Sequence, residues 1–74
     1  MTKKDEQLLQ FIGSFIEEKG YAPSYTEMMD GIEEKSKNGI FRSIENLVAA
    51  GCISRVRGIA RSISILPGSV DVAS

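Results

Sequence analysis

The segment SYTEMMDGIEEKSKNGIFRSIENLVAAG, residues 24–51, contains the signals of two consecutive helices with a short turn between them. Ser24 and Glu27 fit the S-x-x-E capping box, in which each side chain accepts a hydrogen bond from the backbone amide of the other residue. Pro23 favours extended backbone directly before this helix start. Positions 33–35 hold no apolar residue. The segment therefore predicts a short helix, a turn at 33–35 and a longer helix.

The longer helix is expected from about Lys37 to Ala50, with Ser36 as its cap and Gly51 as its end. Its apolar residues recur at helical spacing and should form a buried stripe made of Ile40, Ile44, Leu47 and Val48. The opposite face holds Asn38, Arg42, Glu45 and Ala49. We expect that face to be exposed in any fold that buries the stripe.

An amphipathic helix is also predicted upstream, from Lys3 to Lys19. Thr2 and Asp5 can form a second capping box, and Gly20 supplies the residue type that commonly ends a helix in left-handed conformation. The apolar residues of this helix fall on one face and are Leu8, Leu9, Ile12, Phe15 and Ile16. Phe11 lies toward the edge of that stripe and is expected to pack at the boundary of the core.

After Gly51 the hydrophobic period changes from that of a helix to that of a strand. Residues 52–57 and 61–66 are rich in β-branched side chains and are expected to pair as a hairpin with a connection around Gly58. The predicted fold is mainly α with a small β-hairpin, a three-helix winged helix-turn-helix in residues 1–66. Residues 67–74 lack periodicity and are expected to form a flexible tail.

Charge is sorted along the chain, although the net charge is only −1. Residues 1–34 hold three cationic and eight acidic side chains. Residues 35–66 hold six cationic side chains and one carboxylate, Glu45. A basic half within a nearly neutral chain indicates a polyanionic partner, and nucleic acid is the first candidate.

Size and composition limit the alternatives. A chain of 74 residues is long enough for one core, and its 42% hydrophobic content is that of a folded protein. A single cysteine, Cys52, and no histidine leave neither an internal disulfide nor an expected metal site. Without a signal peptide or an apolar stretch of membrane-spanning length, we expect a soluble cytoplasmic protein that does not contact membranes.

Two motifs resemble the N-terminal DNA-binding domain of LexA-type repressors over about residues 2–66. The first is G-x-x-P-[ST]-x-x-E-[IL], matched by Gly20, Pro23, Ser24, Glu27 and Met28. The second, L-x-x-x-G-x-I followed by G-x-x-R-x-I-x-x-L, is matched by Leu47, Gly51, Ile53, Gly58, Arg61, Ile63 and Leu66. The resemblance implies a bacterial or phage transcription regulator whose partner is double-stranded DNA.

The resemblance also implies roles for particular residues. Family members contact operator bases with the start and exposed side of the third helix, here Ser36, Asn38, Gly39, Phe41 and Arg42. Asn38 is suited to adenine, Phe41 to a thymine methyl and Arg42 to guanine. The expected DNA-binding set is completed by Ser24, Lys35, Lys37, Arg55, Arg57 and Arg61. The three hairpin arginines are expected to contact phosphate because no carboxylate lies near them in sequence.

Simpler roles stay open for several of these residues. Ser36 can serve only as a helix cap, Phe41 can be a boundary core residue, and Lys35 and Lys37 can be ordinary solvated charges. Some members of the family carry acidic residues at positions 41 and 42, so a different operator is expected. The turn glycine common in the family is Glu33 here, which predicts a shifted or differently built turn.

The sequence ends at Ser74, before the peptidase-like domain with which LexA-type repressors cleave themselves and dimerise. Unless the chain is a fragment of a larger repressor, we expect no self-cleavage, and either a stand-alone regulator or a homodimer formed through its own surface. The alternative to DNA binding is a winged helix that contacts another regulatory protein, such as an antirepressor. No nucleophile and base pair, phosphate-binding glycine loop or cofactor motif indicates an enzyme.

Overall fold

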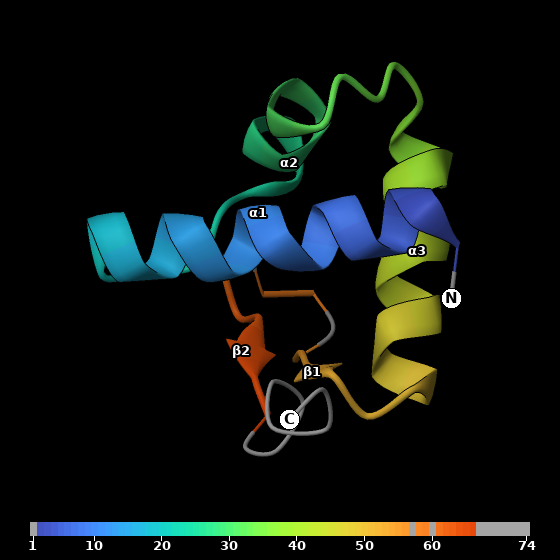
Figure 1. Cartoon of the computed structure of the whole chain (residues 1–74). Coiled ribbons are helices and arrows are strands. Elements are labelled where there is room, and N and C mark those ends of the chain that lie inside the picture. Colours follow the sequence, from blue (N-terminus) through green and yellow to red (C-terminus); the bar gives the residue numbers. More distant parts are fainter. Residues whose placement is uncertain (1, 57, 60, 67–74) are drawn as a thin grey trace.

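Three capped helices and a short antiparallel hairpin make up the protein, in a computed structural model that describes residues 2–56, 58–59 and 61–66. The helices are α1 (Lys3–Lys19), α2 (Tyr25–Gly31) and α3 (Lys37–Ala49). The strands are β1 (Ile53–Ser54) and β2 (Ser64–Ile65). This confirms the predicted winged helix-turn-helix (Figure 1). The predicted tail, residues 67–74, lies outside the described residues, as does Arg57.

Both predicted capping boxes form. The Thr2 hydroxyl accepts from the Asp5 amide at 3.1 Å, and the Asp5 carboxylate accepts from the Thr2 amide at 3.0 Å. Ser24 and Glu27 exchange the same two bonds at 3.2 and 2.8 Å. Because α2 has only seven residues, it cannot be stable alone and depends on this cap and on packing.

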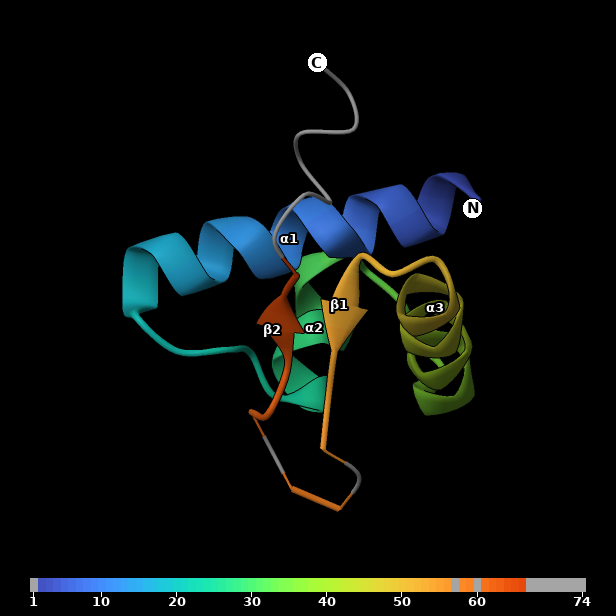
Figure 2. The same cartoon turned by 90° about the horizontal axis from the view of Figure 1, so that it is seen from below.

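Helix α1 crosses α3, with α2 above α1 and the hairpin below it in the view of Figure 1, and the core lies among these elements. Figure 2 shows the same arrangement from below. All three helices and both sides of the hairpin contribute buried side chains, which are Leu8, Ile12, Ala22, Met28, Ile40, Ile44, Leu47, Ile53 and Ile63. Burial of this cluster fixes the angle between α2 and α3. None of the helices in the described residues is long and apolar enough to cross a membrane.

One residue of the predicted stripe on α3 is not buried. Val48 is 38% exposed, whereas Ser43, which the apolar pattern passed over, is buried. The buried face of α3 is therefore turned toward α1, where the carboxylate of Asp5 is also buried and accepts a hydrogen bond from the Asn46 amide at 3.1 Å. Ser43 rather than Val48 lies on the buried face, where its side chain forms a hydrogen bond with the Asp5 carboxylate.

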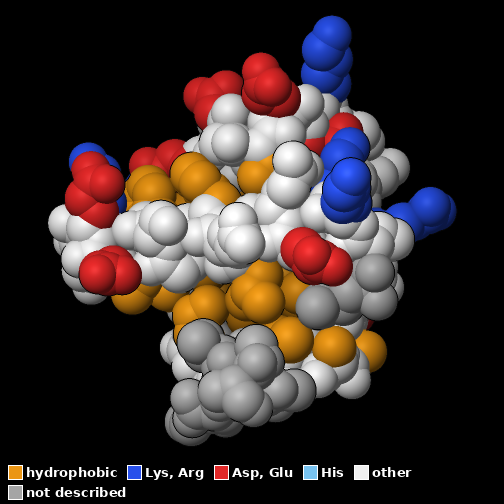
Figure 3. Space-filling view, viewed as in Figure 1, with side chains coloured by type: hydrophobic (Ala, Val, Ile, Leu, Met, Phe, Trp, Pro, Cys, Tyr) orange, Lys and Arg blue, Asp and Glu red, His pale blue; other side chains and the backbone are white. Residues whose placement is uncertain are grey.

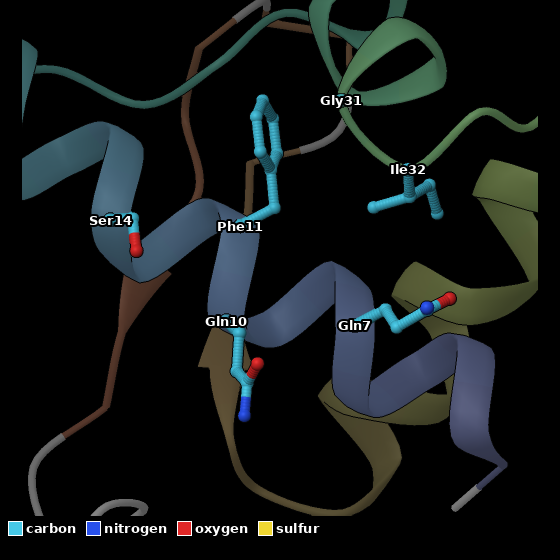
Figure 4. Close-up of a pocket in the computed structure, with 6 residues that line it drawn as sticks. All are labelled: Gln7, Gln10, Phe11, Ser14, Gly31 and Ile32. Atoms are coloured by element: carbon cyan, nitrogen blue, oxygen red, sulfur yellow. The ribbon is translucent and has the colours of Figure 1, made fainter.

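Helix α2 packs closely against α1. Phe11 projects from α1 toward Gly31, the last residue of α2 (Figure 4). A Cβ at position 31 would collide with the Phe11 ring, so glycine permits this approach. The half-buried Phe11 therefore packs at the boundary of the core, as its place on the helix predicted.

The hairpin, called the wing from here on, has a shorter ladder than predicted. Ile53 pairs with Ile65 and Ser54 with Ser64, and the predicted strands 52–57 and 61–66 shrink to two residues each. Beyond Ser54, the Ser62 hydroxyl accepts from the Val56 amide and donates to the Val56 carbonyl, both at 3.0 Å. A side chain thus takes the place of the backbone partner, which ends the ladder.

Candidate nucleic-acid interface

The face of α3 opposite the core is exposed, as predicted. Asn38, Arg42, Glu45 and Ala49 are all exposed, and the residues that lead into the helix, Lys35, Ser36 and Lys37, are exposed as well. Phe41 and Gly39 are half-buried beside them. The start and outer side of α3 therefore bring most of the predicted contact residues to one surface.

Lys35 and Lys37, called the α3 lysines from here on, flank the cap of this helix. Neither side chain has an ion pair or hydrogen bond within residues 2–56, 58–59 and 61–66, and the same is true of Arg42. In Figure 3, cationic side chains project on the side where α3 begins in Figure 1. Their charges are thus available to a ligand.

Ser36 is the helix cap. Its hydroxyl accepts from the Gly39 amide at 3.4 Å, and its own amide donates to Glu34 Oε1 at 3.1 Å. The simpler role left open for Ser36 is therefore present, and the exposed hydroxyl also keeps its capacity to donate. Ser24 is likewise occupied, because its hydroxyl caps α2.

Two acidic residues of the turn beside α3 behave differently from each other. Glu34 Oε2 lies 2.7 Å from Lys4 Nζ, and only 14% of the Glu34 side chain is exposed. Bonds from Lys4 and from the Ser36 amide lower the pKa of Glu34 and keep it ionised. Lys4 of α1 thereby neutralises a carboxylate close to the start of α3, a role that sequence position did not indicate.

Glu33 builds the turn where the family has glycine. Its φ of 56° is left-handed, a region that side chains other than glycine enter at a cost of about 1 to 2 kcal/mol. The turn is therefore not shifted along the chain, but the residue at the glycine position adopts a strained backbone conformation.

Arg55 of the wing is already paired. Its guanidinium forms an ion pair with Glu45 of α3 and donates to the Tyr25 hydroxyl at 3.3 Å. Only 11% of the side chain is exposed. No carboxylate lies near this arginine in sequence, but folding brings Glu45 to it from the preceding helix.

Arg61 is paired in the same way. It donates to Glu27 Oε1 at 2.7 Å and to the Ala22 carbonyl at 3.1 Å, and its guanidinium lies 4.9 Å from the centre of the Tyr21 ring. Hydrogen bonds from the Ser24 amide and from Arg61 lower the pKa of Glu27. Arg55 and Arg61, the wing arginines, therefore hold the wing to the helices. Arg57, the third predicted contact of the wing, lies outside the described residues.

A hollow separates α3 from the wing. Its volume is about 410 Å³, and it is lined by Tyr25, Phe41, Glu45, Arg55 and Gly58. The rings of Tyr25 and Phe41 lie 4.7 Å apart at an interplanar angle of 59°. Tyr25 was absent from the predicted site, because an aromatic residue in the first turn of a short helix gives no local sign of its distant partners.

A short helix, a turn and a second helix with an exposed polar face, followed by a hairpin, define a winged helix-turn-helix domain. Residues 1–62 match the family model described as the LexA DNA binding domain. The chain therefore belongs to this family.

Named relatives agree with the family model. The chain is 39% identical over 72 residues to a LexA repressor of Erythrobacter litoralis and 41% identical over 66 residues to one of Pelagibacter ubique. These matches cover 97% and 89% of this chain but only 31% and 29% of the relatives. The chain thus spans less than a third of the length of these curated relatives.

Proposed function

We propose that this domain binds double-stranded DNA at a specific operator and represses transcription, with α3 in the major groove and the wing on the backbone or in the minor groove. The observation that carries the proposal is the outer face of α3, where Lys37, Asn38 and Arg42 are exposed and lack internal partners in the described residues. Similarity to proteins named LexA repressors supports repression as the outcome.

The residue types on α3 suit base reading. Asn38 offers the bidentate pattern that fits adenine, Arg42 the pattern that fits guanine, and the half-buried ring of Phe41 an apolar contact for a thymine methyl. Ser36, Gly39 and Ser24 lie at helix starts, where hydroxyl and amide groups can contact phosphate. The α3 lysines contribute charge to the same backbone.

The wing completes the contact in a different way. Arg55 and Arg61 hold carboxylates of their own protein, so each must exchange or share that partner to contact phosphate. We assign them mainly to the orientation of the wing. Arg57 remains a proposed phosphate contact.

The proposal is tested by selection from random duplex sequences, followed by a salt titration of the selected site. The expected result is one enriched motif whose affinity falls steeply with salt. Arg42→Ala should reduce discrimination between this motif and a variant at one guanine by about 1 to 3 kcal/mol. Lys19→Ala, at the far end of α1, is the matched control and should change neither quantity.

The same selection separates the alternatives. No motif and no salt dependence would favour a protein-contact role over DNA binding. Paired half-sites in the enriched motif, with two copies of the domain bound, would support a homodimer on the operator.

A further inference from the structure

Tyr25 touches the two parts of the molecule that the proposed function assigns to DNA. It is the first residue of α2 and belongs to neither α3 nor the wing. Its ring packs on Phe41 of α3 at 4.7 Å, and its hydroxyl accepts from Arg55 Nη1 at 3.3 Å. One side chain therefore joins three elements on the surface that faces the ligand.

The contact with Phe41 restricts a side chain that is proposed to touch a base. Phe41 is half-buried and lies between the core stripe and the exposed face of α3. An aromatic side chain in such a position has several rotamers, and restricting it to one of them on binding costs conformational entropy and lowers the affinity. The tilted arrangement with Tyr25, at 59°, is a favourable geometry for an aromatic pair. Tyr25 therefore holds Phe41 in one orientation before DNA arrives.

The contact with Arg55 acts on the wing. Arg55 follows β1 directly, so its position sets where the chain leaves the ladder toward the tip. Its guanidinium is shared between the Tyr25 hydroxyl and Glu45, which is on the exposed face of α3. The hydroxyl thus helps to keep this cation on the protein and the wing at a fixed place beside α3.

The hollow between α3 and the wing shows that these contacts do not merely fill the core. Tyr25, Phe41 and Arg55 all line this open space of about 410 Å³. Tyr25 also packs against the buried core cluster, but it meets Phe41 and Arg55 at a surface that a ligand can approach.

We propose that Tyr25 is a positioning residue for sequence recognition: its ring orients Phe41 for a base, and its hydroxyl retains Arg55 on the protein. The proposal rests on the proposed function, because it assigns Tyr25 a part in the same DNA contact. It adds a determinant of specificity that need not touch DNA itself.

The ring is tested by a double-mutant cycle on the selected DNA site. Tyr25→Leu and Phe41→Ala should each weaken binding to the preferred sequence by about tenfold and flatten the preference at the same base pair. In an Arg55→Gln background, which removes the hydroxyl bond from the comparison, the double variant should be no weaker than Phe41→Ala alone, because both changes then remove one interaction. Phe15→Leu, which removes ring contacts with Phe11 and Tyr21, neither of them in α3, is the control and should leave the preference at that base pair intact.

The hydroxyl is tested separately by Tyr25→Phe, which keeps the ring and the fold. This variant should keep the base preference and make the log-log salt slope steeper by less than the roughly 0.9 of a full phosphate contact, because Arg55 then has only Glu45 to give up or share. In an Arg55→Gln background the same change should leave the slope unaltered.

Opposite results would overturn the proposal. If Tyr25→Leu lowers the preference equally at every base pair of the motif, Tyr25 is a structural residue only. Additive effects of the two substitutions in the cycle would lead to the same conclusion. An unchanged or shallower slope for Tyr25→Phe would remove the role of the hydroxyl. If Tyr25→Leu does not fold, the test of the ring passes to Tyr25→His, which must lower the preference at the base of Phe41. Absence of any wild-type motif would instead overturn the proposed function, and this proposal with it.

Discussion

Lys35 and Lys37 beside α3 project without partners in the described part of the chain, whereas Arg55 and Arg61 of the wing each hold a carboxylate of their own protein. In sequence the two pairs look alike, since all four are cations of the basic half. In the structure they differ in what they can offer a polyanion. An unpaired cation gains a partner on binding phosphate, while a paired one must first give up or share its own.

The difference comes from where the carboxylates lie. Glu45 reaches Arg55 from α3, and Glu27 reaches Arg61 from α2. The wing arginines therefore form ion pairs that fix the wing beside the helices, whereas the α3 lysines remain available to bind a ligand. The cations that hold the interface together are therefore different residues from the cations that are available to bind DNA phosphate.

The largest effect should come from removing the α3 lysines. Lys35→Gln with Lys37→Gln should lower the log-log salt slope of DNA binding by about 1.8, that is 0.9 for each phosphate lost. Arg55→Gln with Arg61→Gln removes the same charge but should lower the slope by less than half as much. Fluorescence anisotropy over a salt series measures both, with folding checked by circular dichroism. Equal decreases in the two double variants would break the comparison.

A scaffold residue should show the converse behaviour. Asp5 is 1% exposed, and Asp5→Ala deprives the Thr2 backbone amide and the Asn46 side-chain amide of their acceptor. Loss of these part-buried bonds should lower the free energy of unfolding by about 1 to 3 kcal/mol while the salt slope stays unchanged. Urea unfolding measures the loss. Glu6→Ala, an exposed carboxylate in the same helical turn, is the control, and an equal loss there would contradict the assignment.

The strained turn allows a smaller change in the opposite direction. Glu33→Gly should raise the free energy of unfolding by about 0.5 to 1 kcal/mol, because the relief at φ 56° exceeds the entropy that glycine loses on folding. Glu33→Ala removes the charge but keeps the Cβ, and it should give no such gain in urea unfolding. If alanine stabilises as much as glycine, charge rather than backbone strain is responsible.

The smallest change is expected with pH. Burial alone would raise the pKa of Asp5, but hydrogen bonds from the Thr2 amide, Ser43 and Asn46 outweigh it and lower the pKa below the ordinary 3.8. A carboxyl group with a lowered folded-state pKa adds stability above its unfolded pKa and loses it as the pH falls through the folded value. Glu27 and Glu34 are shifted in the same direction.

The free energy of unfolding should therefore be steady from neutral pH down to about pH 5 and fall at more acidic pH. Asp5→Asn, which cannot titrate, should start from a lower value and fall less steeply over the same window. Thermal unfolding in a series of buffers measures both slopes. Parallel curves would show that other groups dominate.

Local patterns predicted the helices well because their caps are local. Thr2 with Asp5 and Ser24 with Glu27 are three residues apart, and both boxes form as predicted. The partners of the wing arginines could not be predicted in the same way, since Glu27 and Arg61 are 34 residues apart. Only the packed core brings them together.

The errors have equally specific causes. Val48 has the spacing of a core residue, but the polar cluster of Asp5 and Asn46 turns α3 toward Ser43. The strands of the wing are short because Ser62 replaces a backbone partner, which β propensity does not reveal. The outer face of α3 was predicted correctly because helical periodicity alone places Asn38 and Arg42 opposite the apolar stripe.

The cap of α2 also bears on the order in which the segments of the chain can fold. Glu27 Oε1 accepts from both the Ser24 amide at the start of α2 and the Arg61 guanidinium from the end of the wing. Since a seven-residue helix is not stable alone, its full support exists only when residue 61 has left the ribosome. The helix-turn-helix is thus complete only after the wing has emerged, and the surface for DNA becomes competent only once residues 24–61 are all free to fold.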